Sequence, residues 1–357
     1  MQRRGLLLAG LASPLARGAP AAGATHAPMV FPADFRAHPD SRSEWWYVTG
    51  ELAAEGREYG FQLTFFRSRT DVPLDHPSRF AASQLIFAHA AVTDLAGRRL
   101  RHDQRAARAG FGIASAQVGE TRVHLRDWSF VRDGSQPSSR YRAELRSETA
   151  GFTLELDLAA TQPVLLQGDA GWSRKGPDPD QGSHYYSEPH LQASGRMILD
   201  GRAHQVGGRA WLDHEWSDGY LPDGAVGWDW IGMNLDDGSA LMAFRMRRAD
   251  GSTLWTGGSW RSPGRPPRSF TADEVHFTPL RRWRSASSQA EYPVAWLLEI
   301  PQGSFEVRAR LDDQELDSRG STGAIYWEGT SDLLDAQGRR VGRGYLEMTG
   351  YASALRM

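Results

Sequence analysis

The densest group of titratable side chains in the sequence is Asp213-His214-Glu215, which Trp216 follows directly. If this segment is a strand, alternate side chains point to opposite faces, so His214 shares a face with Trp216 and the two acids share the other. A histidine beside an apolar ring, with carboxylates nearby, can act as a general base. The alternative is a structural histidine that only completes hydrogen bonds inside a core.

A second segment that could carry chemistry is Trp228-Asp229-Trp230. In a strand Asp229 points away from both tryptophans. It either faces solvent at a strand end or places a carboxyl group in an apolar cavity, where a desolvated acid can hold and donate a proton. Trp45 and Trp46 offer flat aromatic surface to an apolar ligand, or they simply fill a core.

Metal and nucleophile chemistry have less support in the sequence. His184, His190 and His214 could converge with Asp213, but no pair of histidines has the helical spacing of a zinc protease. A Gly-x-Ser-x-Gly elbow is missing, which disfavours a serine hydrolase. Cysteine is absent and Lys175 is the only lysine, so thiolate, disulfide and most Schiff-base chemistry is excluded. We therefore predict neither a metal nor a cofactor.

The overall composition restricts the class of partner. The chain has 357 residues, a length that suits two domains, and 41 basic residues stand against 43 acidic ones. Such a balance suggests neither a nucleic-acid binder nor a binder of anionic membranes. The 13 tryptophans are many for a chain of this length.

The elements that must position these residues are strands. From residue 44 onward apolar and polar residues alternate, as in Tyr59, Phe61, Leu63 and Phe65, and turn signals such as Asp200-Gly201 and Asp237-Gly238 separate the segments. Many short strands with such spacing predict an all-β protein with antiparallel sheets, in a barrel or sandwich arrangement.

The strand pattern occurs twice in the chain. EWWYVTGEL followed by GFQLTFFR resembles GWDWIGMNL followed by SALMAFRMR, and GRAWLDHEW resembles VGRGYLEMTGY. We predict two related β-barrels, an N-terminal one over 30–220 and a C-terminal one over 221–357. In the repeat Asp213 corresponds to Glu347, which indicates an architectural role for an acid at this place. His214 corresponds to Met348, so the duplication does not explain the histidine.

The first residues predict export. Residues 1–24 combine Arg3-Arg4, a short apolar run and small-residue cleavage sites, which is the pattern of a signal peptide of either the general secretory or the twin-arginine type. The run is too short to span a bilayer, and no longer apolar stretch follows it. We expect a periplasmic or secreted mature chain without a transmembrane segment.

The motifs EWWYVTG, GFQLTFFR, FAHAAVTD, HYYSEPHLQASG, GRAWLDHEW, GWDWIGMNLDDG, YWEG and GYLEMTGY occur in this order. This set resembles the AttH-like secreted lipocalin-like family, described as predicted secreted hydrolases, over about residues 30 to 353. Carotenoid 1,2-hydratases, or hydroxyneurosporene synthases, are its distant enzymatic relatives. The resemblance implies two lipocalin-like barrels packed side by side, and export. The hydratases add water to a terminal double bond without a cofactor, and His214 and Trp216 match their His-x-Trp element, although Glu215 here departs from it.

Two functions remain open at this point. The first is a carrier of a lipid or terpenoid, with an ABC-type export system of the envelope as a candidate partner. The second is a cofactor-independent hydratase with Asp229 as the acid and His214 as the base. In both, Trp45, Trp46, Tyr186, Trp216, Trp228 and Trp230 are the predicted contacts to the ligand. The enzyme hypothesis requires His214 and Asp229 to face one cavity. A filled barrel without a pocket would instead indicate a structural module.

Overall fold

The computed structural model describes residues 26–134 and 138–355 of the chain, and the predicted signal peptide lies outside these ranges. Within them the chain forms antiparallel strands and one short 3-10 helix, η1 (Ala33–Phe35). No helix in the described ranges has the length and apolar content needed to cross a bilayer. The prediction of an all-β protein is confirmed.

The first barrel is one sheet of thirteen strands, ordered β4-β3-β2-β1-β13-β12-β9-β8-β7-β6-β5, with β10 and β11 paired to β12. At its two ends β3 and β4 contact β5 and β6, so the sheet nearly closes on itself. The strands are β1 (Ser43–Ala54), β2 (Arg57–Arg69), β3 (Gln84–Asp94), β4 (Arg99–Arg108), β5 (Ala114–Ala116), β6 (Arg122–Leu125), β7 (Trp128–Arg132), β8 (Arg140–Ser147), β9 (Phe152–Ala159), β10 (Leu165–Leu166), β11 (Trp172–Arg174), β12 (Gly182–Leu199) and β13 (Arg202–Ser217).

The second barrel is a sheet of ten strands, ordered β17-β16-β15-β14-β23-β22-β20-β19-β18, with β21 paired to β22. Its strands are β14 (Gly227–Leu235), β15 (Ala240–Arg247), β16 (Thr253–Arg261), β17 (Arg268–Phe270), β18 (His276–Arg284), β19 (Glu291–Ile300), β20 (Gly303–Ala309), β21 (Glu315–Ser318), β22 (Ala324–Leu334) and β23 (Arg340–Met348). The predicted boundary at 220/221 falls in the connection between β13 and β14.

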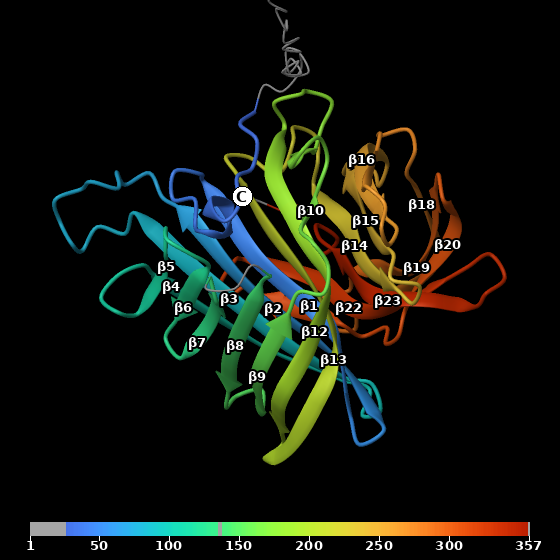
Figure 1. Cartoon of the computed structure of the whole chain (residues 1–357), viewed down its shortest axis with the longest axis horizontal. Coiled ribbons are helices and arrows are strands. Elements are labelled where there is room, and N and C mark those ends of the chain that lie inside the picture. Colours follow the sequence, from blue (N-terminus) through green and yellow to red (C-terminus); the bar gives the residue numbers. More distant parts are fainter. Residues whose placement is uncertain (1–25, 135–137, 356–357) are drawn as a thin grey trace, which may run out of the picture.

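Burial along the strands distinguishes the outer walls from the wall that the barrels share. On β8, buried and exposed residues alternate strictly, because one face meets the barrel core and the other meets water. On β15 every residue is buried, since one face meets the core of the second barrel and the other meets the first barrel. Figure 1 shows the two barrels side by side, with β1, β13, β14 and β23 where they meet.

Each barrel has its own apolar core, and a third cluster fills the contact between them. Tyr47, Tyr185, Trp211, Trp230 and Phe244 belong to this third cluster. Polar contacts reinforce it: the ring nitrogens of His89 lie 2.8 Å from the hydroxyl oxygens of Tyr326 and Ser321 in the other barrel. Burial lowers the pKa of His89 to about 3, so this histidine is neutral. The barrels are therefore lipocalin-like units packed side by side, as predicted.

The pairing registers show where the two repeats correspond. Asp213 on β13 lies opposite Tyr47 on β1 and Ser187 on β12. Glu347 on β23 lies opposite Trp230 on β14 and Glu328 on β22. The equivalence of Asp213 and Glu347 in the sequence repeat thus has a counterpart in the strand pairing, and both side chains point toward the other barrel.

Candidate functional site

A cavity with a volume of about 310 Å³ lies between the two barrels. Its walls come from both repeats, because β1, β2, β12 and β13 form one side while β14, β15, β22 and β23 form the other. The surface of the cavity is mostly apolar, and its aromatic and large apolar lining residues include Trp45, Tyr47, Phe66, Phe87, Tyr185, Tyr220, Trp228, Trp230, Phe244, Met246 and Tyr326. Such a lining suits a small apolar molecule.

Five acidic residues line the cavity, Glu44, Asp213 and Glu215 from the first barrel and Glu328 and Glu347 from the second. The carboxylate of Glu44 is bound by His214, His38 and Arg67. Glu328 and Glu347 are direct partners on adjacent strands. Burial raises the pKa of Glu347 to about 7, and Asp213 and Glu215 add to the effect through their charge. Burial, and then the charge of Glu347, raises the pKa of Glu328 well above its usual value. The pair therefore retains a proton near neutral pH, because two carboxylates side by side repel each other.

The Tyr47 hydroxyl and Oε1 of Glu328 make no hydrogen bond of ordinary geometry within the described residues, although the two side chains are near enough to interact with each other. Both side chains are nearly inaccessible to solvent. An unsatisfied buried polar atom costs about 1–3 kcal/mol, so proteins retain such atoms mainly where a ligand or water completes them. These two atoms mark the polar end of the cavity.

Asp213 is held in a fixed position on the opposite wall. Its carboxylate accepts hydrogen bonds from the Tyr185 hydroxyl at 2.7 Å, from the Ser187 hydroxyl at 2.5 Å and from the Trp211 indole at 2.7 Å. Burial raises the pKa of Asp213 to about 7, although the three hydrogen bonds act in the other direction. The Tyr185 oxygen also accepts from the indole of Trp230, which joins the two barrels at 3.0 Å.

The single lysine is part of the same cavity. Lys175 Nζ lies 2.9 Å from Glu215 Oε1, and it sits over the rings of Tyr185 and Phe244. Ser183 donates a further hydrogen bond to Glu215. This pairing makes Glu215 a carboxylate with its charge balanced.

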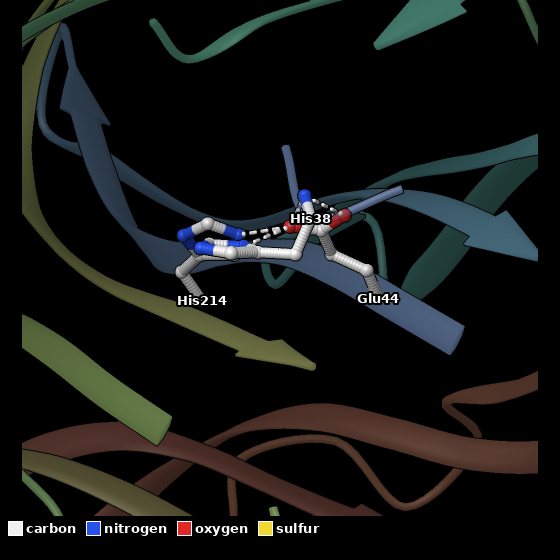
Figure 2. Close-up of side chains that lie close together, drawn as sticks. All are labelled: His38, Glu44 and His214. Carbon is white, nitrogen blue, oxygen red and sulfur yellow. Dashed lines mark hydrogen bonds and ion pairs between the residues drawn. The ribbon is translucent and has the colours of Figure 1, made fainter. Parts of the chain in front are cut away.

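His214 lies inside the first barrel and does not line the interbarrel cavity. Figure 2 shows the rings of His38 and His214 both directed at the carboxylate of Glu44. Glu44 Oε1 is 2.8 Å from His214 Nε2 and 2.9 Å from His38 Nδ1, while Arg67 donates to Oε2 at 2.8 Å. Tyr186 meets His214 Nδ1 at 3.0 Å. Burial lowers the pKa of His214 to about 4, so the ring is neutral at pH 7.

Within the described residues His38, Glu44 and His214 are the set that could offer three ligand atoms to a metal ion, all within 4.8 Å of one another. Of the residues that the sequence suggested as metal ligands, only His214 belongs to this set. Both ring nitrogens approach a single oxygen at hydrogen-bond distance, and Arg67 occupies the other oxygen. Ligands of a tetrahedral ion at about 2.0–2.1 Å stand further apart from one another. The arrangement is that of a hydrogen-bonded network centred on Glu44. Burial alone would raise the pKa of Glu44, but the two histidines hold it well below its usual value.

Asp229 lies inside the second barrel, where two other side chains bind it. Arg245 donates to Asp229 Oδ2 through Nε at 2.9 Å and Nη2 at 2.7 Å. Tyr351 donates to Oδ1 at 2.8 Å. These are the contacts of a carboxylate in an ion pair. The structure therefore does not bring Asp229 and His214 together, since each is buried in a different barrel.

The six predicted ligand contacts divide into two groups. Trp45, Trp228 and Trp230 line the interbarrel cavity. The other three belong to the core of the first barrel, where Trp46 stacks on His214, Tyr186 contacts the same ring, and Trp216 stacks on His38 with ring centroids 3.7 Å apart.

Sequence reasoning missed Glu328, Tyr47 and Lys175 as cavity residues, and it interpreted Glu347 as architectural. A signal was present, because Tyr326-Trp327-Glu328 repeats the pattern of Tyr185-Tyr186-Ser187 with an acid in place of serine. The first repeat has a small polar residue at this position and the second has an acid. A functional site gives a reason for that replacement, whereas the barrel scaffold does not.

The sequence matches the AttH-like family over residues 22–351. A crystal structure of an AttH protein from Nitrosomonas europaea is 48% identical, with a TM-score of 0.84, and the match covers 92% of this chain and 98% of that one. Kievitone hydratase from Nectria haematococca shares the fold at 15% identity and a TM-score of 0.67, covering 91% of this chain and 94% of its own. The protein CghA does so at 12% identity and a TM-score of 0.50, covering 89% and 93%.

No protein with a curated description matches the chain. The family match and the similarity at 48% identity both extend over nearly the whole described fold. The chain therefore belongs to the AttH-like family.

Proposed function

We propose that the chain binds an apolar, unsaturated small molecule in the interbarrel cavity and adds water across one of its double bonds. The observation that carries this proposal is the pair Glu328, which is buried, and Glu347, which is half-buried, two adjacent carboxyl groups that retain a proton beside an aromatic cavity. A proton donor in a dry apolar site is what hydration of an alkene requires.

The proposed reaction uses residues of both walls. The proton shared by Glu328 and Glu347 passes to one alkene carbon, and the adjacent carbon becomes a cation. The faces of Trp228 and Trp230 stabilise that cation. Water attacks the cation and loses a proton to Asp213 on the opposite wall, so that water and alkene give an alcohol. Return of the proton from Asp213 to the glutamate pair through the cavity restores the starting state.

Support for this assignment comes from the contents of the cavity. Asp229 and His214, the acid and base predicted from the sequence, lie in the interiors of two different barrels, so one substrate would have to reach into both. Asp213, Glu215, Glu328 and Glu347 line a single cavity. A hydratase has the same fold, which makes hydration the reaction to test first.

The test is incubation of the purified protein with acyclic terpenoids and unsaturated fatty acids in ¹⁸O-labelled water, followed by mass spectrometry. We expect a product heavier by one labelled water from the wild type and from Glu299→Gln, an exposed control on β19. Glu328→Gln and Glu347→Gln should abolish the label. If Asp229→Asn or His214→Gln abolished the label and the cavity variants did not, the reaction would take place in a barrel interior and the proposed site would be wrong.

The same cavity would serve a carrier of an apolar molecule. An unlabelled lipid or terpenoid that co-purifies with the wild type, and that Trp230→Ala releases, would identify the chain as a carrier and end the hydratase proposal.

A further inference from the structure

A patch of exposed apolar side chains lies on the first barrel, away from the cavity walls. Seven large apolar residues are exposed in the described part of the chain, and four of them come from two neighbouring segments. Phe80, 75% exposed, and Leu74, 48% exposed, lie in the connection between β2 and β3. Phe111 and Ile113, 46% and 41% exposed, lie between β4 and β5. Isolated exposed apolar residues need no explanation, but a cluster indicates a contact surface.

The two segments meet in space. Strand pairing places Leu85, just after the first segment, opposite Arg108, just before the second. The rings of Phe80 and Phe111 then contact each other with their centroids 5.3 Å apart. Figure 1 shows the connection between β2 and β3 as a light-blue loop that projects outward from the first barrel.

Two arginines accompany the rings. The guanidinium of Arg108 lies 4.6 Å from the ring centroid of Phe111 and 5.5 Å from that of Phe80, and Arg79 lies 5.5 Å from Phe111. No ion pair of either arginine occurs among the described residues. The patch thus joins apolar rings, which enter the boundary of a bilayer, to cations, which meet phosphate headgroups at the same depth.

The patch lies at the end of the strands from which the cavity is lined. Arg42, Ser43 and Ser68 line the cavity, and they stand where β1 begins and β2 ends, next to the connection that carries Phe80. A surface in contact with the patch would therefore lie near the end of β1 and β2 where Arg42, Ser43 and Ser68 line the cavity.

We propose that Phe80, Phe111, Arg79 and Arg108 dock the protein onto a lipid bilayer that contains anionic headgroups. The inference rests on the surface alone and stands whether or not the cavity is catalytic. Charge complementarity selects this occupant over an apolar protein face, because a purely apolar partner would bury both guanidinium groups without a counter-charge.

The test is sedimentation of the whole protein with vesicles of phosphatidylcholine alone and of phosphatidylcholine mixed with phosphatidylglycerol. We expect binding to the mixed vesicles, weakened at least about tenfold by Phe80→Ser with Phe111→Ser, because each ring removes apolar area from water. Arg79→Gln should weaken binding to mixed vesicles and leave binding to phosphatidylcholine unchanged. Leu280→Ser, which removes a 53% exposed residue from β18 of the second barrel, is the matched control and should bind as the wild type does.

Equal binding to both kinds of vesicle, or binding that the double variant leaves unchanged, would overturn the proposal. So would a wild type that sediments with neither. If the double variant instead shifts the oligomeric state in size-exclusion chromatography, the patch is a contact between copies of this chain, and the lipid proposal is wrong.

Discussion

Replacing Glu347 by glutamine should change how the stability of the protein depends on pH. The pKa of this half-buried carboxyl group is about 7 in the folded protein, against 4.5 ordinarily. Because the folded value is the higher one, the stability that the group contributes is complete below pH 4.5 and is lost as the pH rises through about 7. Linkage at about 1.4 kcal/mol per pH unit gives a loss of about 2.5 kcal/mol between about pH 5 and pH 8.

Glutamine has the shape of the protonated acid and cannot ionise, so Glu347→Gln should not show this loss. The assay is urea unfolding of the wild type and the variant at several pH values across this range. The free energy of unfolding of the variant, relative to the wild type, should increase by about 2.5 kcal/mol from about pH 5 to pH 8. Glu299→Gln, an exposed change in the same barrel, should give a difference that stays constant with pH.

Parallel pH curves for the wild type and Glu347→Gln would refute the reasoning. They would mean that the carboxyl group ionises in the cavity as easily as in water. The acid of the proposed hydration would then have no proton to donate near neutral pH, and the proposed mechanism would lose its first step.

Three further predictions concern the barrel interiors, and urea unfolding checks each of them. The pKa of His214 is about 4 when folded and 6.5 ordinarily, so up to about 3 kcal/mol of stability should disappear as the pH falls from about 6.5 to 4, and His214→Gln should remove this dependence. Arg245→Leu leaves Asp229 buried without its bidentate partner and should cost about 3–5 kcal/mol, whereas the exposed change Arg248→Leu should cost almost nothing. Gly208→Ala would place a Cβ 1.8 Å from the carbonyl oxygen of Glu51 on β1, so the backbones must separate, at a cost of about 2 kcal/mol.

The fold could be predicted from the sequence because the signals for it are local and repeated. Alternation with period two gave the strands, and the comparison of GRAWLDHEW with VGRGYLEMTGY gave two related units. The alternation also predicted that Asp213 and Glu215 share one face of β13 and His214 the other, and the structure has this arrangement.

The candidate site could not be assembled from the same signals. Alternation tells which residues share a face, but it does not tell whether that face meets the interior of its own barrel or the other barrel. Asp229 lies between two cavity tryptophans in the sequence, and for that very reason it points the other way, toward Arg245. Glu328 is a cavity residue only because β22 passes beside β23, a pairing that tertiary structure decides.

The correspondence between the two walls of the cavity has an evolutionary consequence. Two identical barrels packed about a twofold axis would present every interface residue twice, and any new acid would appear on both walls at once. Joining the barrels in one polypeptide removes that constraint, because each half can then mutate alone. In this chain Ser187 stands beside Asp213, while Glu328 stands beside Glu347 at the equivalent place. The fused chain can therefore place two neighbouring acids on one wall and a single acid bound by hydroxyl groups on the other, an asymmetry that a symmetric dimer of one barrel could not encode.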